Sequence, residues 1–452
     1  MRSMLLSEAA RLLDGELIGA DRAFSAVVSD SRQLVEGALF VALRGERFDG
    51  HDFVAAAAGR GAVAALVERR LELALPQLRV ADTLAALGRL GAAWRQGFRG
   101  PLVALTGSNG KTTLKEMVRA ILAVRGPVLA TQGNLNNHIG VPLTLLRLQD
   151  EHQYAVLEMG ANHPGEIAYL TALARPDVAV VNNAGPCHLE GFGDLDGVAR
   201  GKGEIFQGLG ERGVAVVNAD DAYAAYWRGL NAGRRILDFG LERPAAVRGE
   251  LLGEEGGVRL HWQGQAVDIR LPLPGVHNVR NALAAAAAAL AVGCSLDEIR
   301  QGLEAVQGVA GRLQRLTTAE GAVLINDSYN ANPASLAAAL ATVRGEPRWL
   351  VLGDMAELGP DAAQWHARAG AEARAHGYCR LFALGEHSRR AVATFGAGAA
   401  HYASAEELGA ALRQALAETS EQPTILLKGS RSMRLERIVQ ALLPAEALGA
   451  TH

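Results

Sequence analysis

Short apolar runs alternate with longer amphipathic stretches through the middle of the chain. Four of these runs have the length of buried strands: residues 102–106, 154–158, 177–182 and 214–218. Strands that alternate with helical stretches are typical of βαβ units, which build a mostly parallel sheet. Further on, residues 258–262 and 266–271 alternate in polarity around the turn 263–265, and this pattern predicts an antiparallel hairpin. An alanine-rich helix is expected over residues 279–292.

Similar patterns on both sides of this segment predict two further α/β units. Before residue 98, the runs at 37–43 and 62–67 are typical of buried strands. After residue 311, four more apolar runs alternate with helical stretches: residues 323–326, 349–352, 380–384 and 424–427. The last unit is therefore expected to be a second doubly wound sheet. Together the patterns predict an α/β protein of three domains: residues 1–98, 99–310 and 311–452.

Length, charge and composition reduce the number of function classes to which the protein can belong. The length of 452 residues suggests about three domains, and 45 basic residues nearly balance 48 acidic ones, so we expect no nucleic-acid partner. The longest mainly apolar stretch, residues 282–292, is shorter than the roughly 20 residues that span a bilayer. No secretion signal is recognised at the N-terminus, and Cys187, Cys294 and Cys379 have no paired spacing. These features predict a cytoplasmic protein that does not bind membranes.

A glycine-rich loop precedes an amphipathic helix predicted over residues 112–124. The loop reads Thr106-Gly107-Ser108-Asn109-Gly110-Lys111-Thr112-Thr113. Its glycines let backbone N–H groups turn toward phosphate oxygens, and the helix N-terminus adds partial positive charge. In such loops the lysine reaches the β- and γ-phosphates and the next hydroxyl ligates Mg²⁺. Leu105 stands where the general pattern has its first glycine, but the position between a strand and a helix still predicts a nucleotide site.

Three polar residues downstream are candidates for the same site. Glu158 ends a predicted strand, where doubly wound sheets place ligand-binding groups, and its carboxylate suits Mg²⁺. A helix cap or a surface charge is the alternative role for Glu158. His188 lies in a turn-rich loop after the next strand, although a lone histidine is more often an ordinary hydrogen-bonded side chain. From the residues alone, Lys202 beside Glu204 is expected to be a solvated charge.

Together these motifs resemble those of the Mur ligases, ATP-dependent amide-forming enzymes of peptidoglycan precursor synthesis. The resemblance extends over essentially the whole chain, with motifs at residues 29–32, 45–51, 107–113, 133–137, 158–163, 188–193, 275–282, 311–313, 327–333, 353–359 and 428–431. The runs at 328–333 (Ser-Tyr-Asn-Ala-Asn-Pro) and 354–359 (Asp-Met-Ala-Glu-Leu-Gly) resemble the branch that adds D-alanyl-D-alanine. Residues 385–390 lack the Asp-Asn-Pro-Arg motif of the branch that adds diaminopimelate.

The resemblance implies a three-domain ligase. A small N-terminal α/β domain would bind the UDP-sugar, a central P-loop ATPase-like parallel sheet would bind ATP, and a C-terminal Rossmann-like domain would close over it. The implied reaction makes an acyl phosphate on the terminal carboxylate of UDP-N-acetylmuramoyl-tripeptide. The amine of D-alanyl-D-alanine then attacks to give the pentapeptide product. A monomer is expected, and no single residue is expected to be essential as a base for the amine.

The resemblance also assigns roles to residues. Thr112 and Glu158 would hold the Mg²⁺ bound to ATP, while His188 and a carbamylated Lys202 would hold a second Mg²⁺. A carbamate supplies the two anionic oxygens that an ammonium lacks. The implied catalytic residues are Lys111, His188 and Lys202. The implied nucleotide contacts are Gly107, Ser108, Asn109, Gly110, Lys111, Thr112, Thr113, Asn281, Arg312 and Asp327. The implied substrate contacts are Ser31, Arg44, Asn134, Asn137, Tyr329 and Asn330.

Two other functions also fit the motifs. A folylpolyglutamate synthetase-like ligase shares the short phosphate loop, but the additional N-terminal domain with Asp30-Ser31-Arg32 favours a UDP-sugar substrate. A nucleotide-dependent switch that hydrolyses ATP without ligation would carry the same loop. Phosphate release that depends on both the UDP-sugar and the dipeptide would exclude the switch.

Overall fold

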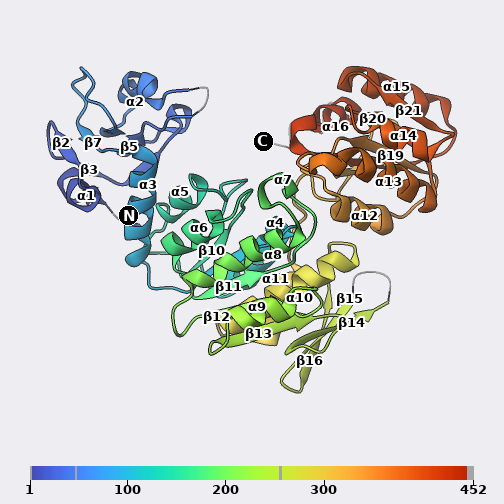
Figure 1. The fold of residues 1–452 in the computed structure, drawn as a ribbon, viewed down its shortest axis with the longest axis horizontal. Helices are drawn as coiled ribbons and strands as arrows, with labels where there is room; N and C mark the ends of the chain where they lie inside the picture. The colour runs from blue at the N-terminus through green and yellow to red at the C-terminus, as the bar shows by residue number, and fades with distance from the viewer. Residues whose placement is uncertain (1–2, 46–47, 254–256, 445–452) are drawn as a thin grey trace.

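The computed structural model describes residues 3–45, 48–253 and 257–444. The described chain forms three α/β parts, and Figure 1 shows the N-terminal part in blue and the C-terminal part in orange and red on opposite sides of the central one. This arrangement confirms the prediction of a three-domain α/β protein with parallel sheets. Glu46 and Arg47 of the N-terminal motif, and residues 445–452 of the predicted third domain, lie outside the described residues.

The N-terminal part is built on a five-stranded sheet in the order β2-β7-β6-β5-β4. Its strands are β2 (Glu16–Ile18), β4 (Ala26–Val28), β5 (Ala38–Val41), β6 (Ala64–Val67) and β7 (Gln77–Arg79), beside the small β1 (Met4–Leu5) and β3 (Ala23–Phe24) pair. Its helices are α1 (Leu6–Leu13), α2 (Val54–Gly59) and α3 (Thr83–Gln96). Trp94 of α3 donates from its indole nitrogen to the Leu148 carbonyl at 2.9 Å. This buried contact ties α3 to the central part.

The central part contains a nine-stranded sheet in the order β16-β15-β14-β13-β12-β11-β8-β10-β9. Its strands are β8 (Leu102–Thr106), β9 (Val128–Ala130), β10 (Tyr154–Glu158), β11 (Val178–Val181), β12 (Val214–Asn218), β13 (Arg235–Gly240), β14 (Val247–Leu252), β15 (Gly257–Trp262) and β16 (Gln265–Arg270). The pairs from β9 to β14 are parallel, and β14, β15 and β16 pair antiparallel. The predicted hairpin is therefore confirmed as the edge of a larger sheet.

Helices cover both faces of the central sheet. They are α4 (Lys111–Ala123), α5 (Gly140–Leu145), α6 (Glu166–Ala174), α7 (Leu189–Phe192), α8 (Leu195–Gly203), α9 (Ala224–Leu230), α10 (Val276–Ala291) and α11 (Leu296–Glu304). The alanine-rich α10 packs against α4 in one apolar cluster with one face of the strands, and α3, α5, α6 and α8 contribute to a second cluster. Small alanine side chains let α10 lie close to the sheet, which accounts for their number in this helix.

The C-terminal part has a six-stranded sheet in the order β17-β18-β22-β19-β20-β21. Its strands are β17 (Gln314–Thr317), β18 (Val323–Asp327), β19 (Arg348–Gly353), β20 (Tyr378–Leu384), β21 (Ala399–Tyr402) and β22 (Thr424–Lys428). The helices α12 (Pro333–Thr342), α13 (Ala362–Ala375), α14 (Arg389–Phe395), α15 (Ala405–Glu418) and α16 (Glu436–Leu442) flank it. Only β17 pairs antiparallel among the strands of this sheet in the described chain.

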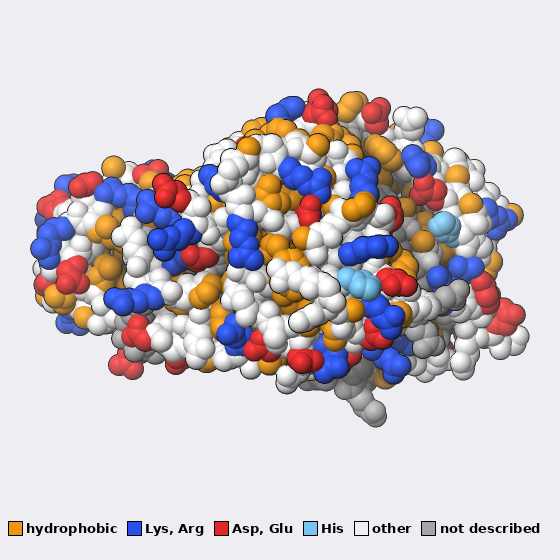
Figure 2. All heavy atoms as spheres, turned by 90° about the horizontal axis from the view of Figure 1, so that it is seen from below, with side chains coloured by type: hydrophobic (Ala, Val, Ile, Leu, Met, Phe, Trp, Pro, Cys, Tyr) orange, Lys and Arg blue, Asp and Glu red, His pale blue; other side chains and the backbone are white. Residues whose placement is uncertain are grey.

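Two further features concern the distribution of charge and the hydropathy of the helices. On the face that Figure 2 shows, basic and acidic side chains are interspersed. In the part of the chain that the structure describes, no helix is both long enough and apolar enough to cross a membrane.

Candidate active site

The strand order of the central sheet places three loops side by side. β8 lies between β11 and β10, with Thr106 paired with Val181 and Leu105 paired with Glu158. The carboxyl ends of these three strands therefore meet at one edge, which is where ligands bind in doubly wound sheets. The glycine-rich loop follows β8, Glu158 ends β10, and the segment with His188 follows β11. Sequence positions more than 80 residues apart thus share one site.

Gly110 gives the loop after β8 its shape. Its φ of 79° lies in the left-handed region that favours glycine, and it caps α4 directly before Lys111. A Cβ atom at this position would lie 2.5 Å from Oδ1 of Asn281 and 2.9 Å from Nδ2 of Asn182. Glycine therefore lets the loop pass close to two buried amides. The first N–H groups of α4 lack partners within the helix and are suited to an anion.

The segment after β11 supports the loop from the other side. The backbone N–H of Ser108 donates to the Asn183 carbonyl at 3.0 Å, and that of Asn109 donates to Oδ1 of Asn183 at 2.9 Å. Nδ2 of Asn182 donates to the Asn109 carbonyl and to Oδ1 of Asn281. Asn182 and Asn183 were not predicted as site residues. Their signal in the sequence is a pair of amides directly after a strand at the ligand-binding edge.

Lys111 lies within this frame and points back along the loop. Its Nζ donates to the Gly107 carbonyl at 2.7 Å and lies 3.4 Å from the Ser108 carbonyl. Burial lowers the pKa of Lys111, and the nearby Glu158 carboxylate acts in the opposite direction. Among the described residues, its hydrogen bonds go to loop carbonyls alone. A half-buried ammonium with such partners fits a role as a counter-charge to phosphate.

Thr112 and Glu158 meet as the resemblance implied. The Thr112 hydroxyl donates to Oε2 of Glu158 at 2.9 Å, and Nδ2 of Asn136 donates to Oε1 at 2.8 Å. Glu158 is 2% exposed, so the alternative of a surface charge is wrong. A buried carboxylate and a hydroxyl are the hard oxygen donors that Mg²⁺ takes. Asn136 was not predicted individually, although it lies within the 133–137 motif.

Arg312 reaches this pair from the C-terminal part. Its Nη2 donates to the Thr112 hydroxyl at 2.8 Å, and its guanidinium lies 4.3 Å from the ring centre of Tyr329. Its Nε is buried without a hydrogen-bond partner. A buried unpaired donor is costly unless a ligand satisfies it. The unpaired Nε therefore fits an anion such as a nucleotide phosphate beside the loop.

Asp327 lies at the carboxyl end of β18 but is engaged within the C-terminal part. Its Oδ1 accepts from the Leu313 N–H at 3.1 Å, and Oδ2 pairs with Nζ of Lys428. Lys428 also donates to the Asn330 carbonyl at 3.2 Å. Lys428 was not predicted individually as a site residue, although it opens the 428–431 motif; the structure places it at the end of β22, adjacent to β18. The lysine and its carbonyl contact hold the predicted residues Asp327 and Asn330 near one another.

Lys202 is buried on α8. It is 1% exposed, so the expectation of a solvated charge is wrong. No ion pair joins it to Glu204, whose carboxylate accepts the backbone N–H groups of residues 165 and 168. Nζ lies 3.5 Å from the Ala161 carbonyl and 5.3 Å from the ring centre of Phe192. Burial, followed in size by the positive charge of Lys111, lowers the pKa of Lys202 to about 8.

The surroundings of Lys202 and His188 bear on a second metal ion. Within the described ranges, no group of three or more histidine, cysteine, aspartate or glutamate residues could hold a metal ion by itself. Any second site must therefore use another donor, and a buried lysine without a carboxylate partner fits conversion to a carbamate. His188 lies at φ 51° and its Nδ1 contacts Glu357 of the C-terminal part. Its Nε2 is the remaining nitrogen for a ligand.

The remaining predicted residues lie away from the phosphate loop or have local roles. Ser31 begins a short turn, and its carbonyl accepts a hydrogen bond from Nη1 of Arg60. Nε of Arg44 lies 3.4 Å from Oε2 of Glu68. Both belong to the N-terminal part, which Figure 1 places on the far side of the centre from the C-terminal part. Oδ1 of Asn137 caps α5 by accepting N–H groups of residues 139 and 140. Asn134 is exposed, and Thr113 lies half-buried in the first turn of α4.

Comparison with known proteins matches each part of the chain to one family. Residues 24–95 match the Mur ligase family catalytic domain, residues 105–289 the Mur ligase middle domain, and residues 311–431 the glutamate ligase domain of Mur ligases. The chain is 47% identical over 451 residues to UDP-N-acetylmuramoyl-tripeptide–D-alanyl-D-alanine ligase of Escherichia coli (strain K12), covering 98% of this chain and 99% of the relative.

Solved structures agree with this match. A crystal structure of MurF from Acinetobacter baumannii is 38% identical, has a TM-score of 0.91 and covers 97% of this chain and 98% of its own. The structure of MurF from Thermotoga maritima in complex with ADP is 27% identical, with a TM-score of 0.80 and coverage of 92% and 96%. Sequence, fold and the three successive domain matches agree, and the chain belongs to the Mur ligase family.

Proposed function

We propose that this protein is an ATP-dependent ligase that joins D-alanyl-D-alanine to the terminal carboxylate of UDP-N-acetylmuramoyl-tripeptide. An ATP site formed by both the central and the C-terminal parts is supported above all by the contact between Arg312 and Thr112. Nε of Arg312 has no hydrogen-bond partner beside the phosphate loop. The substrates are supported by the E. coli relative, whose name states them and which matches 98% of this chain.

The proposed reaction has two steps. A carboxylate oxygen of the tripeptide bonds to the γ-phosphorus of ATP while the bond to the β,γ-bridging oxygen breaks, releasing ADP. The amine of the dipeptide then bonds to the acyl carbon, and the tetrahedral intermediate expels inorganic phosphate. With the dipeptide entering as an ammonium, one net proton is released. The product is UDP-N-acetylmuramoyl-pentapeptide, a precursor for cell-wall synthesis.

The protein contributes position and charge to both steps. Lys111 and Arg312 lie where negative charge would develop during phosphoryl transfer. The N–H groups at the start of α4 add a fixed dipole. The loop residues 107–110 hold the phosphates through their backbone. Asn281, Asp327, Tyr329 and Asn330 extend the site toward the nucleotide and the acceptor.

Two Mg²⁺ ions belong to this proposal. Thr112 and Glu158 would hold one, while His188 and a carbamate on Lys202 would hold the other; bound magnesium neutralises phosphate oxygens. The lowered pKa of Lys202, about 8, supports the carbamate because only the neutral amine adds CO₂. Near neutral pH this lysine has a larger neutral fraction than an ordinary lysine.

Each of the three parts of the chain has its own proposed role. Residues 1–98 would bind the UDP-sugar through Ser31 and Arg44, with Asn134 and Asn137 extending its path. Residues 99–310 would bind ATP, and residues 311–452 would form the Rossmann-like domain that completes the site. The use of ATP and the presence of all reacting groups on one chain support a cytoplasmic enzyme that acts as a monomer.

The test is phosphate release from ATP with Mg²⁺, UDP-N-acetylmuramoyl-tripeptide and D-alanyl-D-alanine, with each component omitted in turn. We expect release only with all four, together with a gain of one dipeptide in the mass of the sugar product. Release without the dipeptide would instead favour an ATP-hydrolysing switch. Ligation of a single amino acid to a folate would favour the folylpolyglutamate synthetase-like alternative.

A further inference from the structure

One polar contact between the central and C-terminal parts joins two residues with uncommon backbone conformations. Nδ1 of His188, from the loop after β11, contacts Oε2 of Glu357, from the loop after β19. His188 has a φ of 51° and Glu357 a φ of 60°, so both lie in the left-handed region that non-glycine residues rarely adopt. Such residues cluster at functional sites, where the surrounding structure holds them in place. The contact is therefore a candidate for a functional role.

Hydrogen bonds anchor the loop of Glu357 within the C-terminal part. The Met355 N–H donates to Nε2 of the buried His366 at 2.9 Å. The Ala356 N–H donates to Oγ of the buried Ser430 at 2.8 Å. The two residues directly before Glu357 are thus fixed, so its carboxylate is presented from a rigid backbone.

The loop of His188 is anchored to the phosphate loop. Sγ of the buried Cys187 donates to Oγ of Ser108 at 3.1 Å, and the same oxygen donates to the Gly185 carbonyl at 3.0 Å. Among the described residues, the His188 side chain makes no capping hydrogen bond to α7, which begins directly after it. The backbone of His188 is therefore held beside the phosphate loop, while its side-chain contact orients the ring.

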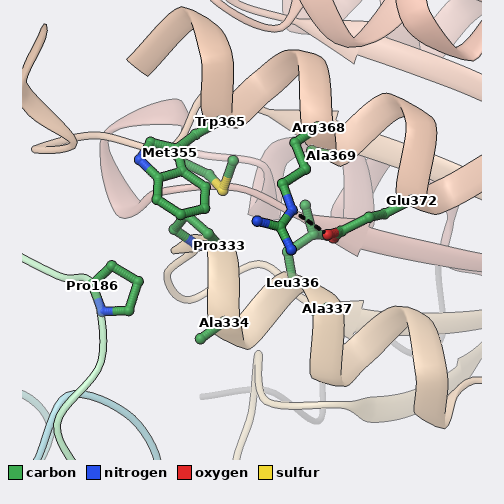
Figure 3. Close-up of a pocket in the computed structure, with 10 residues that line it drawn as sticks. All are labelled: Pro186, Pro333, Ala334, Leu336, Ala337, Met355, Trp365, Arg368, Ala369 and Glu372. Carbon is green, nitrogen blue, oxygen red and sulfur yellow. Dashed lines mark hydrogen bonds and ion pairs between the residues drawn. The ribbon is translucent and has the colours of Figure 1, made fainter. Parts of the chain in front are cut away.

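A cavity of about 200 Å³ lies between the two loops beside this contact. Figure 3 shows Pro186 on one side of it and Met355 with Trp365 of α13 on another. Pro186 is two residues from His188 and Met355 is two residues from Glu357, and two residues of extended chain span at most about 7 Å. Because open space lies between these walls, the contact between His188 and Glu357 joins the two loops directly.

Two other polar contacts hold the C-terminal part against the phosphate loop. Arg312 donates to Thr112, and Nδ2 of Asn332 donates to Oδ1 of Asn109 at 2.8 Å. Contacts at several separate points restrict how one rigid part sits on another. The carboxylate of Glu357 is therefore held at the His188 ring by the docking of the whole C-terminal part.

The partner of Nδ1 determines what Nε2 of His188 can do. An ionised carboxylate only accepts hydrogen bonds, so Nδ1 carries a proton in this contact. The neutral ring then has its lone pair on Nε2. Histidines that bind metal ions commonly have this arrangement, in which a carboxylate fixes both the tautomer and the ring orientation.

We propose that Glu357 is a positioning residue for the second metal ion: it holds the Nδ1–H of His188, so that Nε2 keeps its lone pair for that ion. This inference rests on the proposed function, which assigns His188 and Lys202 to the ion. The C-terminal part then contributes to a metal site whose ligands lie on the central part. The Glu357 and His188 side chains are 45% and 24% exposed, so their pairing adds little to stability and its role is orientation.

The first test needs neither metal nor substrate. Long-range ¹H–¹⁵N NMR of protein labelled with ¹⁵N-histidine shows which ring nitrogen carries the proton, and His188→Gln identifies the His188 signals. In mildly alkaline buffer, where histidine is ordinarily neutral, we expect the proton on Nδ1 in the unmodified protein and in Glu357→Gln, whose amide oxygen still accepts it. Glu357→Ala should populate both tautomers. Asp361→Asn, which changes an exposed carboxylate directly before α13, is the matched control.

The second test measures metal affinity. Electron paramagnetic resonance follows the binding of Mn²⁺, in place of Mg²⁺, in the presence of a non-hydrolysable ATP analogue and bicarbonate. We expect Glu357→Ala to weaken binding of the second Mn²⁺ about 10- to 100-fold, the usual effect of losing such a partner. Glu357→Gln should lose less than about fivefold, because it keeps the hydrogen bond. Asp361→Asn should match the unmodified protein, and the first Mn²⁺ should bind equally in all variants.

The outcomes separate this inference from the proposed function. Equal losses in Glu357→Gln and Glu357→Ala would overturn the positioning role, because they would mean that the carboxylate itself binds the ion. A single Nδ1–H tautomer or an unchanged second Mn²⁺ affinity in Glu357→Ala would overturn it as well, and so would a protein that binds only one Mn²⁺. An unmodified enzyme that shows the expected tautomer and metal effects but does not ligate D-alanyl-D-alanine would overturn the proposed substrates alone.

Discussion

Nη2 of Arg312 lies 2.8 Å from the hydroxyl of Thr112, although the two residues are 200 positions apart in the chain. The contact joins the start of the C-terminal part to the phosphate loop of the central part. Since Thr112 also donates to Glu158, the three side chains form one chain of polar contacts across the junction.

Removing the guanidinium of Arg312 should affect the chemistry more than the fold. We expect Arg312→Gln to lower kcat about 10²-fold or more, because the side chain would stabilise charge that develops in the transition state. Steady-state ligation kinetics measure this loss. Arg315→Gln, an exposed arginine on β17, is the matched control and should retain activity. An Arg312→Gln enzyme with normal kcat would contradict the assignment.

Gly110 should not tolerate a side chain. We expect Gly110→Ala to weaken ATP binding at least about tenfold, because alanine is strained at φ 79° by about 1–2 kcal/mol. Its Cβ atom would also lie 2.5 Å from Oδ1 of Asn281. Isothermal titration calorimetry with ATP would measure the change in affinity. Gly210→Ala is the control, since nothing lies within 4 Å of a Cβ atom there; equal losses in both variants would contradict the prediction.

Glu158 should determine the response to magnesium. Glu158→Gln keeps the shape of the side chain but removes its charge, so we expect the Mg²⁺ concentration for half-maximal activity to rise at least about tenfold. Activity measured across a magnesium series at saturating ATP tests this. Glu151→Gln, an exposed residue between α5 and β10, should leave the series unchanged. A normal magnesium response in Glu158→Gln would remove Glu158 from the metal site.

Lys202 should make stability depend on pH. Its pKa is about 8 in the folded protein, below its ordinary value of 10.5, so the unfolded chain binds more protons between these values. Stability associated with this group is therefore present above about pH 10.5 and lost as pH falls through about 8. A shift of this size corresponds to about 3 kcal/mol.

Replacing Lys202 removes that dependence. In metal-free and CO₂-free buffer, Lys202→Met should be more stable than the unmodified protein at pH 7 by up to about 3 kcal/mol, and the difference should shrink toward pH 10. Denaturant unfolding of both proteins at several pH values measures it. A difference that does not vary with pH would show that the buried ammonium is not destabilising.

Part of the fold follows from local pattern. The runs at residues 102–106, 154–158 and 214–218 form strands with those bounds, because strands buried on both faces are apolar throughout. β13 and β14 were not predicted. Both mix exposed polar and buried apolar positions near the edge of the sheet, so they lack a continuous apolar run.

The residues of the site likewise fall into those that the sequence reveals and those that only the folded structure reveals. The phosphate loop could be recognised because its lysine, hydroxyl and glycines are consecutive in the chain. Asn136 and Asn182 could not be selected among many amides, since their roles depend on which side chains lie beside them. Lys428 was missed for the same reason: its partner Asp327 lies on the neighbouring strand and 101 positions away.

The sequence by itself determined the α/β class, the three-part organisation, the phosphate loop and the resemblance to the Mur ligases, because these depend on neighbouring residues and on their periodicity. Only the tertiary structure decided that Lys202 is buried, that Arg312 and Asn332 reach the phosphate loop, and that a cavity forms between Pro186 and α13. Burial and contacts across a junction result from packing among distant segments, and the free energy of a charge depends on that packing more than on its neighbours in the chain.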